Sequence, residues 1–334
     1  MTKENKRGNA FTNNPIVKAI GSQKLVVLIA IVVLFVAFSL GSDSFFQYTT
    51  MLSLLDMIYY IAFMAIGVTF CLITGGVDLS IGTGMMCYSL IGAFLVVHKG
   101  LPVWAGILVC ILCGIAMGFF NGFLVAVLNL PPFIATLCSM MITRGLGSLV
   151  SGGLSVAWPA SSTPEGAFRN LFKLNVGGTI IPIGLIFVLV AAVIMSVILN
   201  KTRPGRYIIA VGSNKEALRL SGVNVVKWQW LAYVISGIFT GLAAVAYAGV
   251  FSSSVAPGGG AGLEMDAICG AIIGGTSMNG GVGTISGTLL GVLVMGLLQI
   301  GLPFVGFQAS GQQIITGLVL ILAVYVDVLK NKNK

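Results

Sequence analysis

The sequence predicts an all-α integral membrane protein, a polytopic helical bundle of about ten spans. Of its 334 residues, 57% are hydrophobic and 8% are charged, and the mean hydropathy is +1.03. This is more apolar material than a water-facing surface can cover. Apolar runs of about 20 residues, the length that crosses a hydrocarbon core of about 30 Å, recur with short breaks. We therefore expect one transmembrane domain over residues 25–327, with lipid as its main solvent.

Ten apolar segments are expected to cross the membrane. The first follows a basic leader that is long for a signal peptide and lacks a clean Ala-x-Ala site, so a retained span is favoured. Two segments carry weaker patterns: 79–98 follows a glycine-rich break, and 263–278 is short, begins with Glu264 and Asp266, and could be re-entrant. The segments are 25–41, 51–73, 79–98, 103–128, 132–151, 179–199, 228–250, 263–278, 284–303 and 309–327.

Basic residues gather in three clusters that predict the orientation. They lie in the N-terminal segment 1–24, in the polar stretch 200–227 and in the tail 328–334. Six predicted spans separate the first two clusters and four separate the last two, so all three return to one face. By the positive-inside rule this face is cytoplasmic, together with both termini. The net charge of +9 therefore indicates membrane orientation rather than nucleic-acid binding.

Glycine is expected to shape both the packing and the breaks of the bundle. Residues 114, 118 and 122 are glycines at four-residue spacing, as are 237 and 241, and such small faces let helices approach closely in lipid. Glycine-rich stretches 74–80 and 274–281 interrupt the helical pattern. Such breaks survive in membranes only against protein or water. They mark either span ends at a solvated face or the edge of a translocation path.

Asp56 and Asp78 lie within or beside predicted spans. An ionised Asp at a helix centre costs about 2.5–3.5 kcal/mol on insertion scales, so Asp56 and Asp78 are expected to face protein or water. Asp56 is expected near the outer interface. For Asp78, in the first glycine-rich break, capping of the turn's backbone N–H groups is favoured over contact with a transported solute.

The polar stretch 200–227 contains a predicted surface helix. Asn214 fits an N-cap, Glu216 lies in the first turn, Arg219 lies near the end, and Gly222 can close the helix. A helix of about two turns is marginal alone in water, so we expect it to dock against another element or a partner. A simple connecting loop is the alternative interpretation.

Several motifs, in the same order along the chain, resemble those of permeases from bacterial monosaccharide ABC importers, the ribose, galactose, arabinose and xylose group. They lie at 74–82, 121–137, 205–225 and 266–284, and the resemblance covers the chain from about residue 25. It implies a pair of permease copies, expected to be a homodimer, in the bacterial cytoplasmic membrane. It also implies a separate cytoplasmic ATPase and an extracytoplasmic sugar-binding protein.

The resemblance also implies roles for particular residues. The chain has no GxxxxGK[ST] phosphate loop, so ATP-Mg is expected on the partner ATPase, and this chain is expected to bind no cofactor or metal. The cytoplasmic coupling helix and the loop before it are expected to contact the ATPase. The coupling residues are Gly205, Arg206, Asn214, Glu216, Ala217, Leu218, Arg219 and Gly222.

A neutral sugar is recognised by hydrogen-bonding groups and apolar contacts rather than by fixed charge. The candidates for the translocation path are Asp78, Ser80, Asn121, Thr136, Asn279 and Gln299. The external loop 152–178 contains Thr163 and Pro164, a helix start, before an expected amphipathic interfacial helix. That helix either rests at the lipid headgroups or receives the sugar-binding protein. The docking candidates are Phe168, Arg169, Phe172 and Lys173.

The alternative function is an ion-coupled secondary transporter of a small polar solute, because broken spans and buried acids suit ion coupling. The coupling-loop resemblance argues against it. An intramembrane enzyme is not expected, since the sequence has no HExxH or GxSxG pattern and a single histidine, His98.

Overall fold

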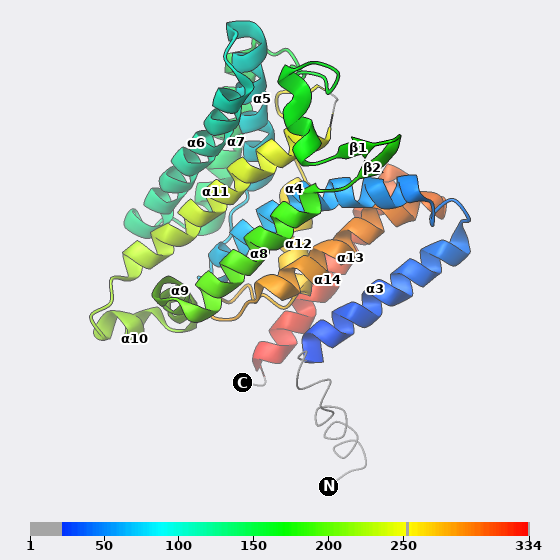
Figure 1. The fold of residues 1–334 in the computed structure, drawn as a ribbon. Coiled ribbons are helices and arrows are strands. Elements are labelled where there is room, and N and C mark those ends of the chain that lie inside the picture. The colour runs from blue at the N-terminus through cyan, green and yellow to red at the C-terminus, as the bar shows by residue number, and fades with distance from the viewer. Residues whose placement is uncertain (1–21, 252–253, 333–334) are drawn as a thin grey trace.

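The computed structural model describes residues 22–251 and 254–332 (Figure 1). Most of the predicted basic leader, including Lys3, Lys6, Arg7 and Lys18, lies outside the described residues. The helices are α3 (Ser22–Gly41), α4 (Tyr48–Ile73), α5 (Ile81–Lys99), α6 (Val103–Gly122), α7 (Pro132–Ser151), α8 (Gly184–Lys201), α9 (Arg203–Ser213), α10 (Lys215–Leu220), α11 (Val225–Val250), α12 (Leu263–Ile273), α13 (Ile285–Phe304) and α14 (Ala309–Lys332). A π-helical turn, η1 (Phe123–Val127), continues α6.

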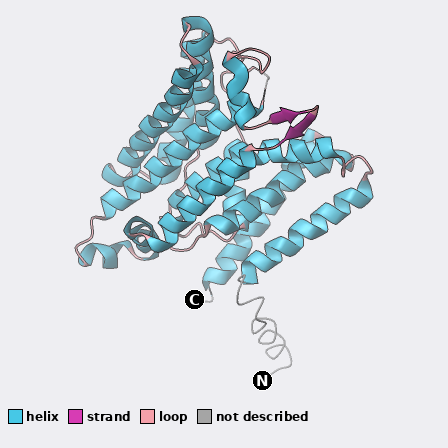
Figure 2. Ribbon diagram, in the orientation of Figure 1, coloured by secondary structure: helices cyan, strands magenta, loops and turns pink. Residues whose placement is uncertain are grey.

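The ten predicted spans all coincide with helices, which confirms the all-α polytopic fold. Within the described ranges, eight helices are long and apolar enough to cross a membrane, and α14 is apolar over Ala309–Tyr325. The protein is therefore a multi-pass membrane protein. The sixth span begins later than predicted, because residues 174–181 form an antiparallel hairpin of β1 (Leu174–Val176) and β2 (Thr179–Ile181) before α8 (Figure 2).

Helices α4 and α11 form the centre of the bundle. From Ile58 to Ile73, α4 is buried on every side, as expected of a helix that is apolar all round. It packs against α11, α12 and α13. Helices α3, α6, α7 and α8 lie farther out and expose apolar side chains such as Val32, Leu108, Ile142 and Val193. Their outer faces are suited to lipid or to another membrane subunit.

Glycines let α6 and α11 pack with their backbones in direct contact. A Cβ atom added to Gly118 would lie 3.1 Å from the Cα of Gly237, and one added to Gly241 would lie 2.8 Å from the Cα of Ile111. These distances leave no space for a side chain. The predicted small faces at four-residue spacing are therefore confirmed as a packing device.

The short helix α12 is half of a broken span. Its 11 residues extend about 16 Å at 1.5 Å per residue, too little to cross a bilayer alone. The described parts of segment 251–262 supply the rest: Val255 forms a backbone bridge with Val156, and Gly260 packs against Gly82 at the start of α5. The extended segment and α12 together make one crossing, so the predicted even number of spans holds.

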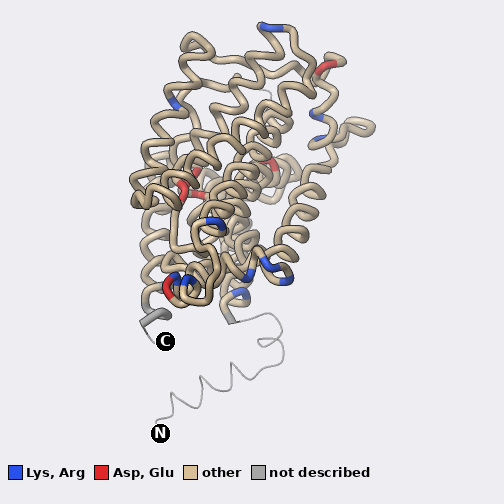
Figure 3. Tube along the Cα trace, turned by 90° about the vertical axis from the view of Figure 1, so that its left-hand side faces the viewer, with Lys and Arg blue, Asp and Glu red and all other residues tan. Residues whose placement is uncertain are grey.

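The bundle has two distinct ends, separated by α8 (Figure 1). The β-hairpin precedes α8 and defines the hairpin end, whereas α9 follows α8 and defines the α9–α10 end. Lys and Arg residues concentrate toward the α9–α10 end, as Figure 3 shows in blue. Those described there are Lys24, Lys201, Arg203, Arg206, Lys215, Arg219 and Lys227.

Candidate translocation and coupling sites

The two glycine-rich breaks, about 200 residues apart in the sequence, lie against each other at the α9–α10 end. The N–H of Gly281 donates a hydrogen bond to the carbonyl of Ile73 at 2.8 Å. A Cβ on Gly280 would lie 2.9 Å from the backbone nitrogen of Gly75. Gly212, in the last turn of α9, packs on both breaks, next to Ile73 and Gly281. Any movement of α9 therefore acts directly on the two breaks.

Asp78 is the centre of a closed polar network. Its side chain is 1% exposed. Oδ1 accepts hydrogen bonds from the backbone N–H of Ser80 at 3.1 Å and from its hydroxyl at 2.6 Å, and Oδ2 accepts from the hydroxyl of Ser236 at 2.8 Å. The Asn121 amide donates to the Ser80 hydroxyl at 2.9 Å and accepts from Ser139 at 2.5 Å. The prediction that Asp78 orders its turn is confirmed.

This network ties the first break to three further elements of the bundle, because Asn121, Ser139 and Ser236 come from α6, α7 and α11. Thr136 is also fully buried, and its hydroxyl donates to the Pro132 carbonyl at 2.9 Å. Of the predicted path residues, Asp78, Ser80, Asn121 and Thr136 are thus buried within the protein in this conformation. Asn279 is exposed at the break between α12 and α13.

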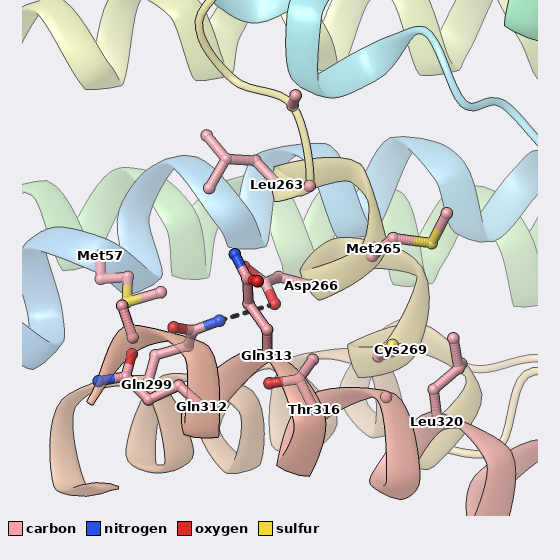
Figure 4. Close-up of a pocket in the computed structure, with 14 residues that line it drawn as sticks. Met57, Leu263, Met265, Asp266, Cys269, Gln299, Gln312, Gln313, Thr316 and Leu320 are labelled. Atoms are coloured by element: carbon pink, nitrogen blue, oxygen red, sulfur yellow. Dashed lines mark hydrogen bonds between the residues drawn. The ribbon is translucent and has the colours of Figure 1, made fainter. Parts of the chain in front are cut away.

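Gln299 lines a half-open cavity of about 430 Å³ between α12, α13 and α14, with Met57 of α4 at one side (Figure 4). Its Nε2 donates to Oδ1 of Asp266 at 3.1 Å, and Asp266 is 4% exposed. Gln312, Gln313 and Thr316 of α14 also line the cavity. Sequence reasoning identified Gln299 and missed the α14 residues, although adjacent glutamines in an apolar span were a signal that could have indicated them.

Buried side chains fasten the external loop to the bundle. Thr163 accepts from the N–H of Gly166 at 3.2 Å, but the helix begins one residue later than predicted, with Pro164 at the N-cap position, and it is a 3₁₀ helix, η2 (Glu165–Leu171). Arg169 is 4% exposed and donates to the carbonyls of Phe251 at 2.8 Å, Pro159 at 2.9 Å and Trp158 at 3.3 Å. Burial lowers the pKa of the Arg169 guanidinium.

Two of the four predicted docking residues are buried, so the predicted docking set is wrong for those two. Arg169 and Phe172 are buried, so they hold the loop in place and do not offer an open surface. Phe168 is partly buried and packs against Trp158, with ring centroids 5.5 Å apart. Lys173 forms an ion pair with Asp56 at 2.5 Å, so Asp56 has a protein partner at the hairpin end. A docking role remains a prediction for Phe168 and Lys173.

Helix α9 was not predicted as a separate helix. Its start has a recognisable signal, since the extended residue Thr202 precedes Pro204 in the first turn. Ile208 and Val211 are buried, and Gly205 packs against the end of α8 beside Leu199. Its neighbour Arg206 is exposed. Helix α9 is therefore amphipathic, with its apolar side against the bundle and its polar side open.

Helix α10 has the predicted ends. The side chain of Asn214 accepts from the N–H of Ala217 at 2.9 Å, and Gly222 takes φ +79° just after the helix. Glu216 and Arg219 pair at 3.0 Å, and both are 72% exposed. The helix and its N-cap are thus confirmed. Of the predicted coupling residues, Ala217 is exposed and Leu218 is half-buried.

Helices α9 and α11 contact α10 and leave much of it uncovered. Lys215 donates to the Gln229 side chain of α11 at 3.2 Å, and burial lowers the pKa of the Lys215 ammonium. Leu220 is 84% exposed, which is unusual for a leucine at a water-facing end. Together with Ala217 it gives α10 an apolar patch available to a partner.

Comparison with known proteins places these elements in a family. Residues 50–324 match the family described as "Branched-chain amino acid transport system / permease component". The chain belongs to this family. As a member, this permease is a transport subunit and not an enzyme. No solved structure matches the chain significantly.

Curated relatives match nearly the whole permease. The chain is 36% identical over 304 residues to the ribose import permease of Escherichia coli K12, covering 90% of this chain and 92% of that protein. It is 31% identical over 308 residues to the L-arabinose transport system permease of the same strain, covering 92% and 91%. It is 32% identical over 309 residues to the fructose import permease of Rhizobium meliloti, covering 92% and 85%.

Proposed function

We propose that this permease is the membrane-spanning subunit of a binding-protein-dependent ABC importer of a monosaccharide. The observation that carries the proposal is the likeness to permeases named for ribose, L-arabinose and fructose over at least 90% of this chain. These three solutes are all neutral monosaccharides. The cavity lined by amide side chains is in keeping with a neutral, polyhydroxylated solute.

In the proposed orientation the α9–α10 end and both termini are cytoplasmic, and the hairpin end faces outward. The concentration of Lys and Arg at the α9–α10 end supports this choice through the positive-inside rule. A cytoplasmic ATPase, which binds ATP-Mg, contacts α10. An extracytoplasmic sugar-binding protein delivers the sugar at the hairpin end, and two copies of the permease assemble side by side in the membrane.

The proposed coupling follows the contacts of α9. The ATPase moves α10, α10 moves α9 through the Asn214 junction, and α9 acts through Gly212 on the two glycine-rich breaks. The breaks join α4 to α5 and α12 to α13. A small displacement at the cytoplasmic surface can therefore change the relative positions of four helices.

The test of this function is the energy source for uptake. We expect proteoliposomes that contain the permease and its ATPase to import a radiolabelled monosaccharide when loaded binding protein is outside and ATP is inside. Imposed proton or sodium gradients should not replace ATP. Import that follows an ion gradient and needs no ATPase would favour the secondary transporter instead.

Reversal of the charges on α10 tests its contact with the ATPase. In Glu216→Arg/Arg219→Glu the exposed ion pair can re-form, and such pairs contribute only about 0–1 kcal/mol, so folding and membrane insertion should be unchanged. The two charges on the surface that contacts the ATPase exchange places, and we expect uptake to fall about tenfold or more. Co-purification of the ATPase measures the contact directly. Full transport by the double variant would exclude α10 as the coupling helix, and Asp43→Arg, in the exposed turn between α3 and α4, is the control.

A further inference from the structure

We propose that the cavity between α12, α13 and α14 is the site at which the sugar pauses inside the membrane, bound by Asp266, Gln299, Gln312, Gln313 and Thr316. The inference rests on the proposed function and adds the location and chemistry of the solute's binding site. It extends the path prediction from Gln299 to residues of α12 and α14.

The cavity has the size and lining expected for a neutral sugar. Its volume of about 430 Å³ lies within the range of about 300–1,000 Å³ typical of small-molecule sites. Carboxylate, amide and hydroxyl groups supply both acceptors and donors for sugar hydroxyls. Met57, Leu263 and Leu320 add apolar surface for the carbon face of a sugar ring. Among the described lining residues there is no Lys, Arg or His, so an anionic solute would find no counter-charge.

The polar lining is costly unless water or solute occupies the cavity. Polar side chains within a membrane face protein or water rather than lipid, because unpaired polar groups in an apolar medium cost several kcal/mol. Gln312 and Thr316 are four residues apart on α14 and share one face, which lines the cavity beside Asp266 and Gln299 (Figure 4). Three helices, α12, α13 and α14, thus direct their few polar groups into one space.

The cavity leaves open space beside its carboxylate, whereas the network around Asp78 is closed. The Asp78 carboxylate, the Ser80 hydroxyl and the Asn121 amide bond to one another or to Ser139 and Ser236, which leaves no space for a solute. The Asp266 carboxylate is held from one side by Gln299 and borders an open volume. Of these two intramembrane acids, Asp266 has the geometry of a binding group.

The depth of the cavity in the membrane also suits a sugar delivered from outside. Helix α13 begins next to the second break, at the α9–α10 end, and Gln299 lies near its opposite end, five residues before Phe304. The cavity is therefore in the half of the bundle toward the hairpin end. The C-terminal end of α12, by contrast, joins the break that Gly212 of α9 contacts. A shift of that break would move α12 and could open the cavity toward the cytoplasmic side.

The first experiment compares initial uptake rates in proteoliposomes that contain the permease and its ATPase. Asp266→Asn and Gln312→Leu should each lower uptake at least tenfold, while ATP hydrolysis stimulated by the binding protein continues. Gln308→Leu, one turn before Gln312 and outside the cavity, should behave as wild type. A variant that is misfolded or unassembled would lose the stimulated ATP hydrolysis. Retained hydrolysis therefore shows that the variants are folded and assembled.

A second experiment does not depend on a disruptive substitution. Thr316→Cys should import sugar at first, lose uptake after 2-aminoethyl methanethiosulfonate treatment and regain it with dithiothreitol, and the transported sugar should slow the modification. Wild type, which carries the native Cys269 in the same cavity, and Gln308→Cys give the background reaction. The cavity is excluded as the sugar site if wild type imports sugar and Asp266→Asn, Gln312→Leu and the modified Thr316→Cys import it at the wild-type rate. If wild type imports no monosaccharide, the proposed function fails and the cavity assignment falls with it.

Discussion

Asp78→Ala is expected to destabilise the folded permease by about 3–5 kcal/mol, a large effect for one substitution. The change removes the acceptor for the Ser80 hydroxyl at 2.6 Å and for the Ser236 hydroxyl at 2.8 Å. Each buried donor left without a partner costs about 1–3 kcal/mol, and the cavity left by the side chain adds to this cost. The turn between α4 and α5 also loses its cap on the N–H of Ser80.

Thermal unfolding in detergent, followed by tryptophan fluorescence, measures this effect. For a chain of this length, we expect the apparent Tm of Asp78→Ala to fall by about 5 °C or more. Asp78→Asn keeps one acceptor oxygen and should lose less. Asp43→Ala, at an exposed turn, is the matched control and should melt like wild type. Equal melting of Asp78→Ala and Asp43→Ala would show that the network contributes little.

The second large effect is expected at Gly212, where α9 contacts both breaks. A Cβ at this position would lie 2.5 Å from the backbone nitrogen of Gly281 and closer still to the carbonyl oxygen of Ile73. Both neighbours are backbone atoms, so neither can rotate away. Gly212→Ala must therefore displace α9 from the breaks, and overpacking of this kind costs about 1–3 kcal/mol.

For transport, we expect Gly212→Ala to separate ATP hydrolysis from uptake. The surface of α10 is unchanged, so the ATPase should still bind and hydrolyse ATP, while sugar imported per ATP should fall about tenfold, equivalent to about 1.4 kcal/mol of lost coupling. Gly145→Ala is the control: Gly145 is also helical, lies outside the cavity, and a Cβ there meets nothing within 4 Å. A wild-type ratio of sugar to ATP in Gly212→Ala would mean that movement reaches the breaks by another route.

The positions of the spans could be predicted because the bilayer imposes a length and a composition on each of them. The pattern even distinguished α12 as short, since Glu264 and Asp266 interrupt its apolar start. The N-cap at Asn214 was likewise predictable because a cap depends on neighbouring residues. Helix α9 was missed because its buried residues, Ile208 and Val211, are few and lie within a polar stretch.

The candidate sites were less predictable because their partners are distant in sequence. Nothing local to Asp78 indicates that Ser139 and Ser236 complete its network. Arg169 was predicted to be accessible because arginine usually is, but three backbone carbonyls from the loop itself and the end of α11 are arranged around it. The lining of the cavity required the relative rotation of α12, α13 and α14 about their axes, which depends on tertiary packing.

The broken eighth crossing, which contains α12, has a consequence for biosynthesis. An 11-residue helix with two acids in its first turn cannot partition into lipid alone as it leaves the ribosome, since a central Asp costs about 2.5–3.5 kcal/mol on insertion scales. Helices α11 and α13 can insert alone. Helix α12 must then be drawn into the bundle against α4, α5, α13 and α14, the helices that it contacts. The nascent chain therefore acquires its final number of crossings by folding within the membrane, and a ribosome-bound intermediate ending before α13 should leave α12 accessible to water.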